Sequence, residues 1–72
     1  MKFEFTAHAR TRCRERKIRY RDVRSAVENP ARTAVNPSGA IESRKKIGAK
    51  TLVVIFEVSR EVRTIITAYY ED

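Results

Sequence analysis

A histidine and two arginines near the start of the chain are spaced to share one face of a helix. His8, Arg12 and Arg16 follow one another at intervals of four residues, and residues at that spacing are neighbours along a helix surface. Histidine exchanges a proton near neutral pH, and arginine binds phosphate groups through paired hydrogen bonds. The triplet is therefore a candidate for proton transfer and charge stabilisation at a phosphate ester. An exposed basic ridge with an incidental histidine is the ordinary alternative.

A second set of charged side chains alternates along a predicted strand. Glu42, Arg44 and Lys46 are each separated by one residue, and alternate residues of a strand point to the same face of a sheet. The set combines a carboxylate that can take up a proton with two cations that can stabilise negative charge. One sheet face should thus be charged at this strand. A salt-bridged edge strand would explain the same pattern.

Two tyrosines and one cysteine complete the candidates. Tyr69 and Tyr70 end the last predicted strand, where they could stack on a base or donate a hydroxyl to a phosphate, although tyrosine is also a common strand residue. Cys13 is the single cysteine, so an internal disulfide is excluded and a reducing compartment is indicated. It lies on a predicted core stripe, where a free cysteine is usually inert packing.

The charge of the chain favours an anionic partner. Lys and Arg number 16 against 9 Asp and Glu, which gives a net charge of +7, and such an excess attracts polyanions. Residues 10–24 hold eight basic side chains, including Arg10, Arg16 and Arg19, which are candidates for RNA binding. A long apolar run is absent, so we expect no membrane segment. One histidine and one cysteine cannot build a typical zinc site, and we expect neither a metal nor a cofactor.

The elements that must position these residues fall into two groups, beginning with helices. A short lead-in strand or an extended arm at Phe3 and Phe5 precedes a helix that Thr6 can cap and that ends near Arg16. A second helix covers about 20–28, with an apolar stripe at helical spacing, and Asn29-Pro30 ends it. Ile18 should pack in the connection between the two helices.

Strands follow the helices. Short strands are predicted at 33–35 and 40–47, around the turn signal at 36–39. The apolar run at 51–58 predicts a central strand covered on both faces. Residues 62–69 alternate, which predicts that Val62, Thr64, Ile66 and Ala68 share one face of the last strand. The sum is one α+β domain over residues 1–72, with two N-terminal helices on a three- to four-stranded antiparallel sheet.

Several short motifs carry a resemblance to known families. The C-terminal half resembles BrnT toxins, in which E-x-R, I-G, an apolar strand and R-x-I-S-A occur in this order. The N-terminal half resembles a related uncharacterised family of small proteins with H-A-x-x-R, E-R-x-I and N-P. The matching stretches are Glu42-Ser43-Arg44, Ile47-Gly48, Leu52 to Phe56 and Arg63 to Ala68 for the first, and His8 to Arg12, Glu15 to Ile18 and Asn29-Pro30 for the second.

BrnT belongs with the RelE-like toxins, so the resemblance implies a RelE/BrnT-like fold and metal-independent RNA cleavage by attack of a 2′-hydroxyl on the adjacent phosphate. It implies that Arg44, with Arg12, stabilises the phosphate charge, that Glu42 or His8 is the base, and that Lys46 shares the charge. BrnT has a basic residue where this chain has Tyr69. The resemblance implies that Tyr69 takes the place of this cation, either by stacking or by donating its hydroxyl.

The implied partners are RNA, either mRNA at the ribosome or tRNA, and an acidic antitoxin protein in the cytoplasm. The sequence leaves open whether the chain forms a homodimer. Two other functions stay open: a non-catalytic RNA-binding or nucleic-acid-binding module, and a basic protein-interaction domain. The cleavage hypothesis requires His8, Arg12, Glu42 and Arg44 to meet in one concave site.

Overall fold

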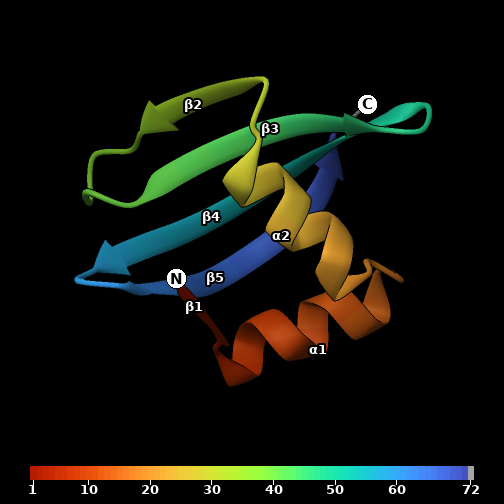
Figure 1. Ribbon diagram of the computed structural model, residues 1–72. Helices are drawn as coiled ribbons and strands as arrows, with labels where there is room; N and C mark the ends of the chain where they lie inside the picture. Colours follow the sequence, from red (N-terminus) through yellow and green to blue (C-terminus); the bar gives the residue numbers. More distant parts are fainter. Residues whose placement is uncertain (72) are drawn as a thin grey trace.

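Two helices lie on one face of a five-stranded sheet in the computed structural model, which describes residues 1–71 (Figure 1). This arrangement confirms the predicted α+β class with two N-terminal helices. The elements in chain order are β1 (Lys2–Phe5), α1 (Ala7–Glu15), α2 (Tyr20–Glu28), β2 (Arg32–Val35), β3 (Ile41–Ile47), β4 (Lys50–Ser59) and β5 (Val62–Glu71).

The sheet has the strand order β1-β5-β4-β3-β2. The strands β2 to β5 form the predicted antiparallel meander, while β1 pairs with β5 in parallel. The sheet therefore has one strand more than the upper end of the prediction, because the N-terminal arm joins it. Phe3 and Phe5 explain this pairing, since both pack against the core from β1 and would expose apolar surface if the arm were free.

Local signals in the sequence set the ends of both helices. The Thr6 hydroxyl accepts a hydrogen bond from the Ala9 N–H at 3.0 Å, so one of the unpaired donors at the start of α1 is satisfied. Ile18 is buried in the connection, as predicted. The second helix ends at Glu28, directly before Asn29-Pro30, because proline disfavours the helical conformation at the residue before it.

The hydrophobic core fills the space between the helices and one sheet face. The small side chains Ala9 and Cys13 let α1 approach the sheet closely, and α2 contributes the apolar stripe that its sequence predicted. The fully or almost fully buried members are Ala9, Cys13, Ile18, Val23, Ala26, Val27, Leu52, Val54, Phe56, Ile65 and Ala68. We call this side of the sheet the helix face and the other side the open face.

A bulge in β5 overturns the predicted assignment of its faces. Phe56 of β4 pairs with Ile65, but the preceding Ile55 pairs with Thr67, so Ile66 is an extra residue in β5. An extra residue reverses the alternation beyond it. Ile65 and Ala68 therefore share the helix face and are both fully buried, whereas strict alternation predicted them on opposite faces.

The central strand β4 is covered by the helices on one face and by side chains of the neighbouring strands on the other. The helices cover Leu52, Val54 and Phe56. On the open face, Val53 is also fully buried, although the helices lie on the other side of the sheet. Its cross-strand partners are Arg44 on β3 and Tyr69 on β5, whose long side chains can shield it. The prediction of a doubly covered strand holds at this position.

Candidate functional site

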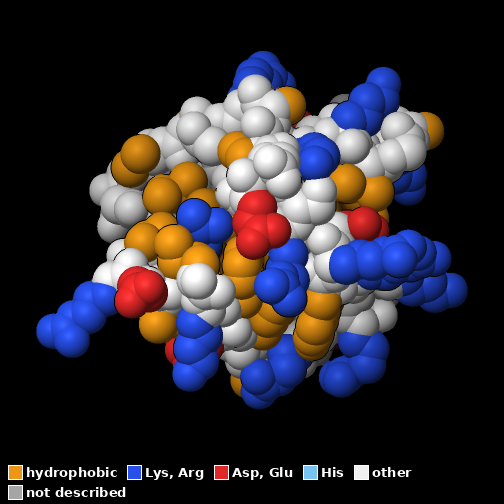
Figure 2. All heavy atoms as spheres, in the orientation of Figure 1, with side chains coloured by type: hydrophobic (Ala, Val, Ile, Leu, Met, Phe, Trp, Pro, Cys, Tyr) orange, Lys and Arg blue, Asp and Glu red, His pale blue; other side chains and the backbone are white. Residues whose placement is uncertain are grey.

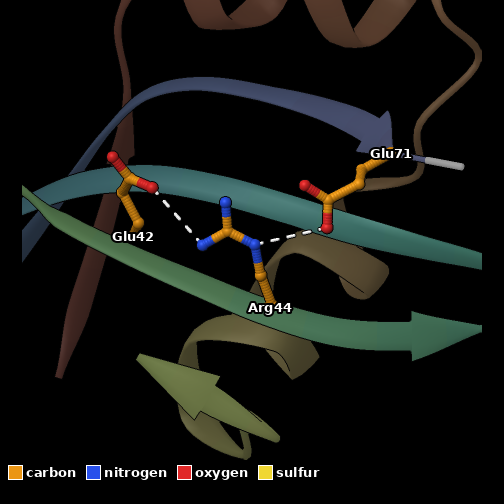
Figure 3. Close-up of polar contacts among 3 residues, drawn as sticks. All are labelled: Glu42, Arg44 and Glu71. Atoms are coloured by element: carbon orange, nitrogen blue, oxygen red, sulfur yellow. Dashed lines mark hydrogen bonds and ion pairs between the residues drawn. The ribbon is translucent and has the colours of Figure 1, made fainter. Parts of the chain in front are cut away.

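Three charged side chains from two strands meet on the open face (Figure 3). The guanidinium of Arg44 donates through Nη1 to Glu42 Oε1 at 3.4 Å and through Nε to Glu71 Oε1 at 3.3 Å. Glu42 and Arg44 lie on β3, and Glu71 lies on β5, beyond the intervening β4. We call these residues the acidic–arginine cluster. It brings a cation and two potential proton acceptors together on one surface.

The neighbours of the cluster hold its strand in place. Ser43 and Lys45 alternate with Glu42 and Arg44 and point to the helix face, where Ser43 is fully buried. The ammonium group of Lys45 donates a hydrogen bond to the Ser25 hydroxyl on α2 at 2.7 Å. A slip of one residue would exchange the two faces and bury Glu42 and Arg44. The buried serine and the Lys45–Ser25 bond therefore fix which side chains reach the open face.

The electrostatics of the cluster favour a charged arginine. The hydrogen bond to Glu71 raises the pKa of Arg44 above its ordinary value, burial opposes this shift, and the charges of both carboxylates add to it. The side chain of Arg44 is 24% exposed and that of Glu71 is 39% exposed, so a ligand can reach the cluster from solvent. A guanidinium held by two carboxylates is fixed in position, but its charge is offset until an anion displaces one of them.

A shallow pocket of about 240 Å³ lies beside the cluster. It is lined by Arg32, Thr33, Ala34 and Arg44. Arg32 is directly opposite Arg44 in the register of β2 and β3, and Ala34 is opposite Glu42. The small side chain of Ala34 leaves a hollow between longer neighbours, and two arginines border it. A concave surface with two arginines is suited to an oxyanion.

The remaining strand candidates divide between the two faces. Lys46 is exposed and opposite Thr51, on the open face with Glu42 and Arg44. Tyr69 is opposite Val53 and also lies on the open face. Tyr70 packs instead against the core, and the ammonium of Lys50 lies 5.9 Å from its ring centre. Only the first tyrosine is therefore placed to meet a ligand at the acidic–arginine cluster.

The helical candidates do not join this cluster. His8 and Arg12 belong to α1, which packs on the helix face, whereas Glu42 and Arg44 point to the open face. Arg12 pairs with Glu15 of its own helix at 3.0 Å. The expected concave site of all four residues is not formed, because the sheet separates the two pairs. Spacing along a helix predicts a shared helix face, but it gives no information on which sheet face that helix covers.

A separate basic surface covers the helical side of the molecule. Side chains of Lys and Arg gather there, notably at the right of Figure 2, where Figure 1 has the connection between α1 and α2. Some are held by the protein: Arg10 donates to the Phe5 carbonyl, Arg16 donates to the Ala68 carbonyl, and Arg24 lies over the Phe3 ring. Others have no side-chain partner within residues 1–71, namely Arg14, Lys17, Arg19 and Arg21. We call these four the connection cluster.

Cys13 is a packing residue in this structure. Its side chain is 1% exposed, and burial raises the pKa of its thiol, an effect that the nearby charge of Arg16 partly offsets. A buried thiol that resists ionisation is a poor nucleophile. Residues 1–71 hold no group of three or more His, Cys, Asp or Glu side chains arranged to bind a metal ion.

Two residues of the open-face site were not among the sequence candidates. Arg32 lies at the start of β2, one residue before the predicted strand, and Glu71 lies at the end of β5, two residues beyond it. A signal for Glu71 was present, because Thr67, Tyr69 and Glu71 alternate and share one face. Arg32 could be assigned to the site only from the pairing of β2 with β3, which places it opposite Arg44 and which the sequence alone does not reveal.

The fold and its two surfaces define a small, basic α+β domain with an arginine-rich helical side and a polar open sheet face. The model of the family described as Domain of unknown function (DUF4258) matches residues 5–70, and the chain belongs to that family. The match includes every sequence candidate, while Glu71 lies just outside it. Neither the curated proteins nor the solved structures contain a match to the chain. No helix within residues 1–71 has the length and apolar character needed to span a membrane.

Proposed function

We propose that this protein binds RNA, and that the connection cluster on its helical side makes the main contacts with the phosphate backbone. The observation that supports this proposal is that the connection cluster gathers four exposed cations with no carboxylate partner within residues 1–71, namely Arg14, Lys17, Arg19 and Arg21. An exposed cation without an ion pair can bind a phosphate without first losing an internal contact.

The choice of RNA over other polyanions rests on the resemblance of the C-terminal half to BrnT toxins. The charge alone would also suit DNA, since phosphate contacts carry no information on the sugar or the base. Arginine predominates in the cluster, and its planar group both pairs with phosphate and stacks on unpaired bases. A single-stranded RNA is therefore the ligand that this surface fits best.

Salt-dependent binding tests the proposal. Affinity for a labelled single-stranded oligouridine would be measured over about 50–200 mM salt for the wild type and for the double variant Arg14→Gln/Arg21→Gln. Loss of two phosphate contacts should reduce the slope of log affinity against log salt by about 1.4. Arg60→Gln is the matched control, because Arg60 is exposed at the β4–β5 turn, outside the connection cluster. Equal slopes for all three proteins would contradict the proposal. Tighter binding of the corresponding oligodeoxyuridine would show that DNA, and not RNA, is the preferred ligand.

A second candidate function is metal-independent cleavage of RNA at the open face. The specific observation in its favour is the acidic–arginine cluster beside the pocket that Arg32 and Arg44 line. Combined with the resemblance to RelE-like toxins, it supports an endoribonuclease of a toxin–antitoxin pair, neutralised by an acidic antitoxin. His8 and Arg12 are not part of this version of the site.

In this reaction, Glu42 or Glu71 would take the proton of the 2′-hydroxyl while its oxygen attacks the adjacent phosphorus. Arg44 and Arg32 would stabilise the added negative charge. The bond to the 5′-oxygen then breaks, and a proton donor such as the Tyr69 hydroxyl protonates the departing oxygen. The products are a 2′,3′-cyclic phosphate and a free 5′-hydroxyl, so no bond to water forms in this step.

A cleavage assay in the presence of a metal chelator separates the two candidates. Wild-type protein should cut RNA, while Arg44→Ala and Glu42→Gln should lose at least about tenfold in rate, since removal of one positioned group costs about 1.4 kcal/mol or more in the barrier. Glu57→Gln is the control, because Glu57 is an exposed carboxylate on β4. Circular dichroism would verify folding of each variant. Intact RNA after incubation with folded wild type would leave binding as the function and reject cleavage.

A further inference from the structure

We infer that the free edge of β2 binds an extended acidic segment of a partner protein, which adds a sixth strand to the sheet. Among the strands of the described residues, β2 lies at the end of the sheet order and pairs with β3 alone. All four of its residues are exposed. An edge strand with free backbone groups is a template for strand addition. The inference does not rest on RNA binding by the connection cluster, because β2 lies away from the connection between α1 and α2 (Figure 1).

The hydrogen-bond phase of β2 identifies which backbone groups are free. The Asn36 N–H donates to the Ala40 carbonyl at 2.9 Å, so Asn36 directs its backbone groups toward β3. Alternate residues of a strand direct their backbone groups to opposite edges. Arg32 and Ala34 consequently face β3, while Thr33 and Val35 present their N–H and C=O groups outward. An added strand would pair with these two residues.

The side chains around this edge indicate the character of the added strand. On the open face, a side chain next to Arg32 would also border the pocket that Arg32 and Arg44 line. A glutamate or aspartate there would meet the guanidinium of Arg32, for which no hydrogen bond or ion pair is found within residues 1–71. On the opposite face, Val35 is 72% exposed and would be covered by an apolar neighbour. An acidic segment that alternates with apolar residues therefore fits both faces.

Charge also selects this edge and this occupant over the alternatives. The other edge of the sheet is β1, where Lys2 pairs with Glu4 at 3.8 Å and where Arg24 and Arg63 lie over the Phe3 ring, so the cations near that edge already have partners in the protein. A second copy of this chain would bring another net charge of +7 and another Arg32 to the contact, which like-charge repulsion disfavours.

The probe for the experiment is a capped synthetic peptide of alternating glutamate and valine, with an alternating lysine–valine peptide as its charge-reversed control. Amide hydrogen exchange and chemical shifts of isotope-labelled protein report on each backbone N–H. The expected result is new protection of the Thr33 and Val35 amides by the acidic peptide alone, with the β1 amides unchanged. The inference is overturned by absence of these changes up to a peptide concentration of about 1 mM.

Two variants separate backbone pairing from charge. Val35→Pro removes an outward N–H and should weaken binding more than tenfold, whereas Val35→Thr keeps this N–H and should bind nearly as wild type. Arg32→Gln should weaken binding about fivefold through the loss of one ion pair. Equal binding by Val35→Pro and Val35→Thr would refute strand addition. Protection of Thr33 and Val35 by oligouridine or by self-association, with none by the acidic peptide, would equally exclude a protein partner at this edge.

Discussion

Replacing Ser43 by alanine should stabilise the protein, although the substitution removes a polar group from the strand that carries the acidic–arginine cluster. Ser43 is fully buried and faces the helices from β3, and its hydroxyl has no hydrogen-bond partner among residues 1–71. Its cross-strand neighbours are Thr33 on β2 and Val54 on β4. The hydroxyl is therefore shielded from solvent without a hydrogen bond to another described residue.

The magnitude follows from this burial. An unsatisfied buried hydroxyl costs about 1–3 kcal/mol relative to its hydrated state in the unfolded chain. Alanine removes that cost and keeps the Cβ, so the change leaves a void of a single atom, which forfeits a small part of the gain through lost packing contacts. We expect a net increase of about 1 kcal/mol in the free energy of unfolding, and a rise of about 4–8 °C in Tm for a chain of this size.

Urea and thermal unfolding at neutral pH would measure the change, with Ser25→Ala as the matched control. The Ser25 hydroxyl accepts a hydrogen bond from the Lys45 ammonium, so the same substitution there breaks a charge-assisted bond. The better helix propensity of alanine offsets this loss only in part, and a net loss of about 0.5–1 kcal/mol is expected. Opposite signs for the two variants support the reasoning. A destabilised Ser43→Ala would show that the hydroxyl has a partner in solution and would refute it.

Three further substitutions test the helical side. Thr6→Ala should cost about 1 kcal/mol in unfolding experiments, because it removes the cap bonded to the Ala9 N–H. Lys17→Gly should raise the free energy of unfolding by about 0.5–1 kcal/mol, because Lys17 has a φ of +55°, a left-handed conformation that glycine adopts without steric cost. Burial raises the pKa of the Cys13 thiol in the folded protein. The neutral thiol therefore contributes fully to the free energy of unfolding at pH values below the ordinary thiol pKa. This contribution falls as the pH rises toward the pKa of the folded state, because the unfolded chain then loses the proton first. Urea titrations at several pH values should thus show the stability gap between wild type and Cys13→Ala narrowing above about pH 8.5.

The sequence predicted most elements of this fold because their signals are local. A cap at Thr6, a proline after Asn29 and a long β-branched run each act on the chain within a few residues. The bulge at Ile66 and the parallel pairing of β1 were not predicted. Both depend on contacts between distant segments, since β1 pairs with β5 along the sheet while its Phe3 and Phe5 pack on a core that other elements build.

The candidate site was predictable only where its residues share one strand. Alternation placed Glu42 and Arg44 on one face, and the structure confirms that placement. The third member, Glu71, comes from β5 and reaches Arg44 across β4. The association of His8 with Glu42 failed for a related reason. A motif order along the chain does not determine on which side of a sheet a helix packs, since the handedness of connections and the burial of apolar stripes decide that.

The position of the two charged surfaces on opposite sides of the sheet predicts that their variants act independently. If RNA is held by the connection cluster and cut at the open face, Arg14→Gln/Arg21→Gln should lower the affinity and leave the cleavage rate of saturated protein unchanged. Arg44→Ala should do the reverse. Combining them should give the sum of the separate free-energy changes, because the altered residues share no partners. A cleavage rate at saturation that falls with the connection variants would instead require one RNA strand to wrap around the sheet edge and be positioned by both surfaces.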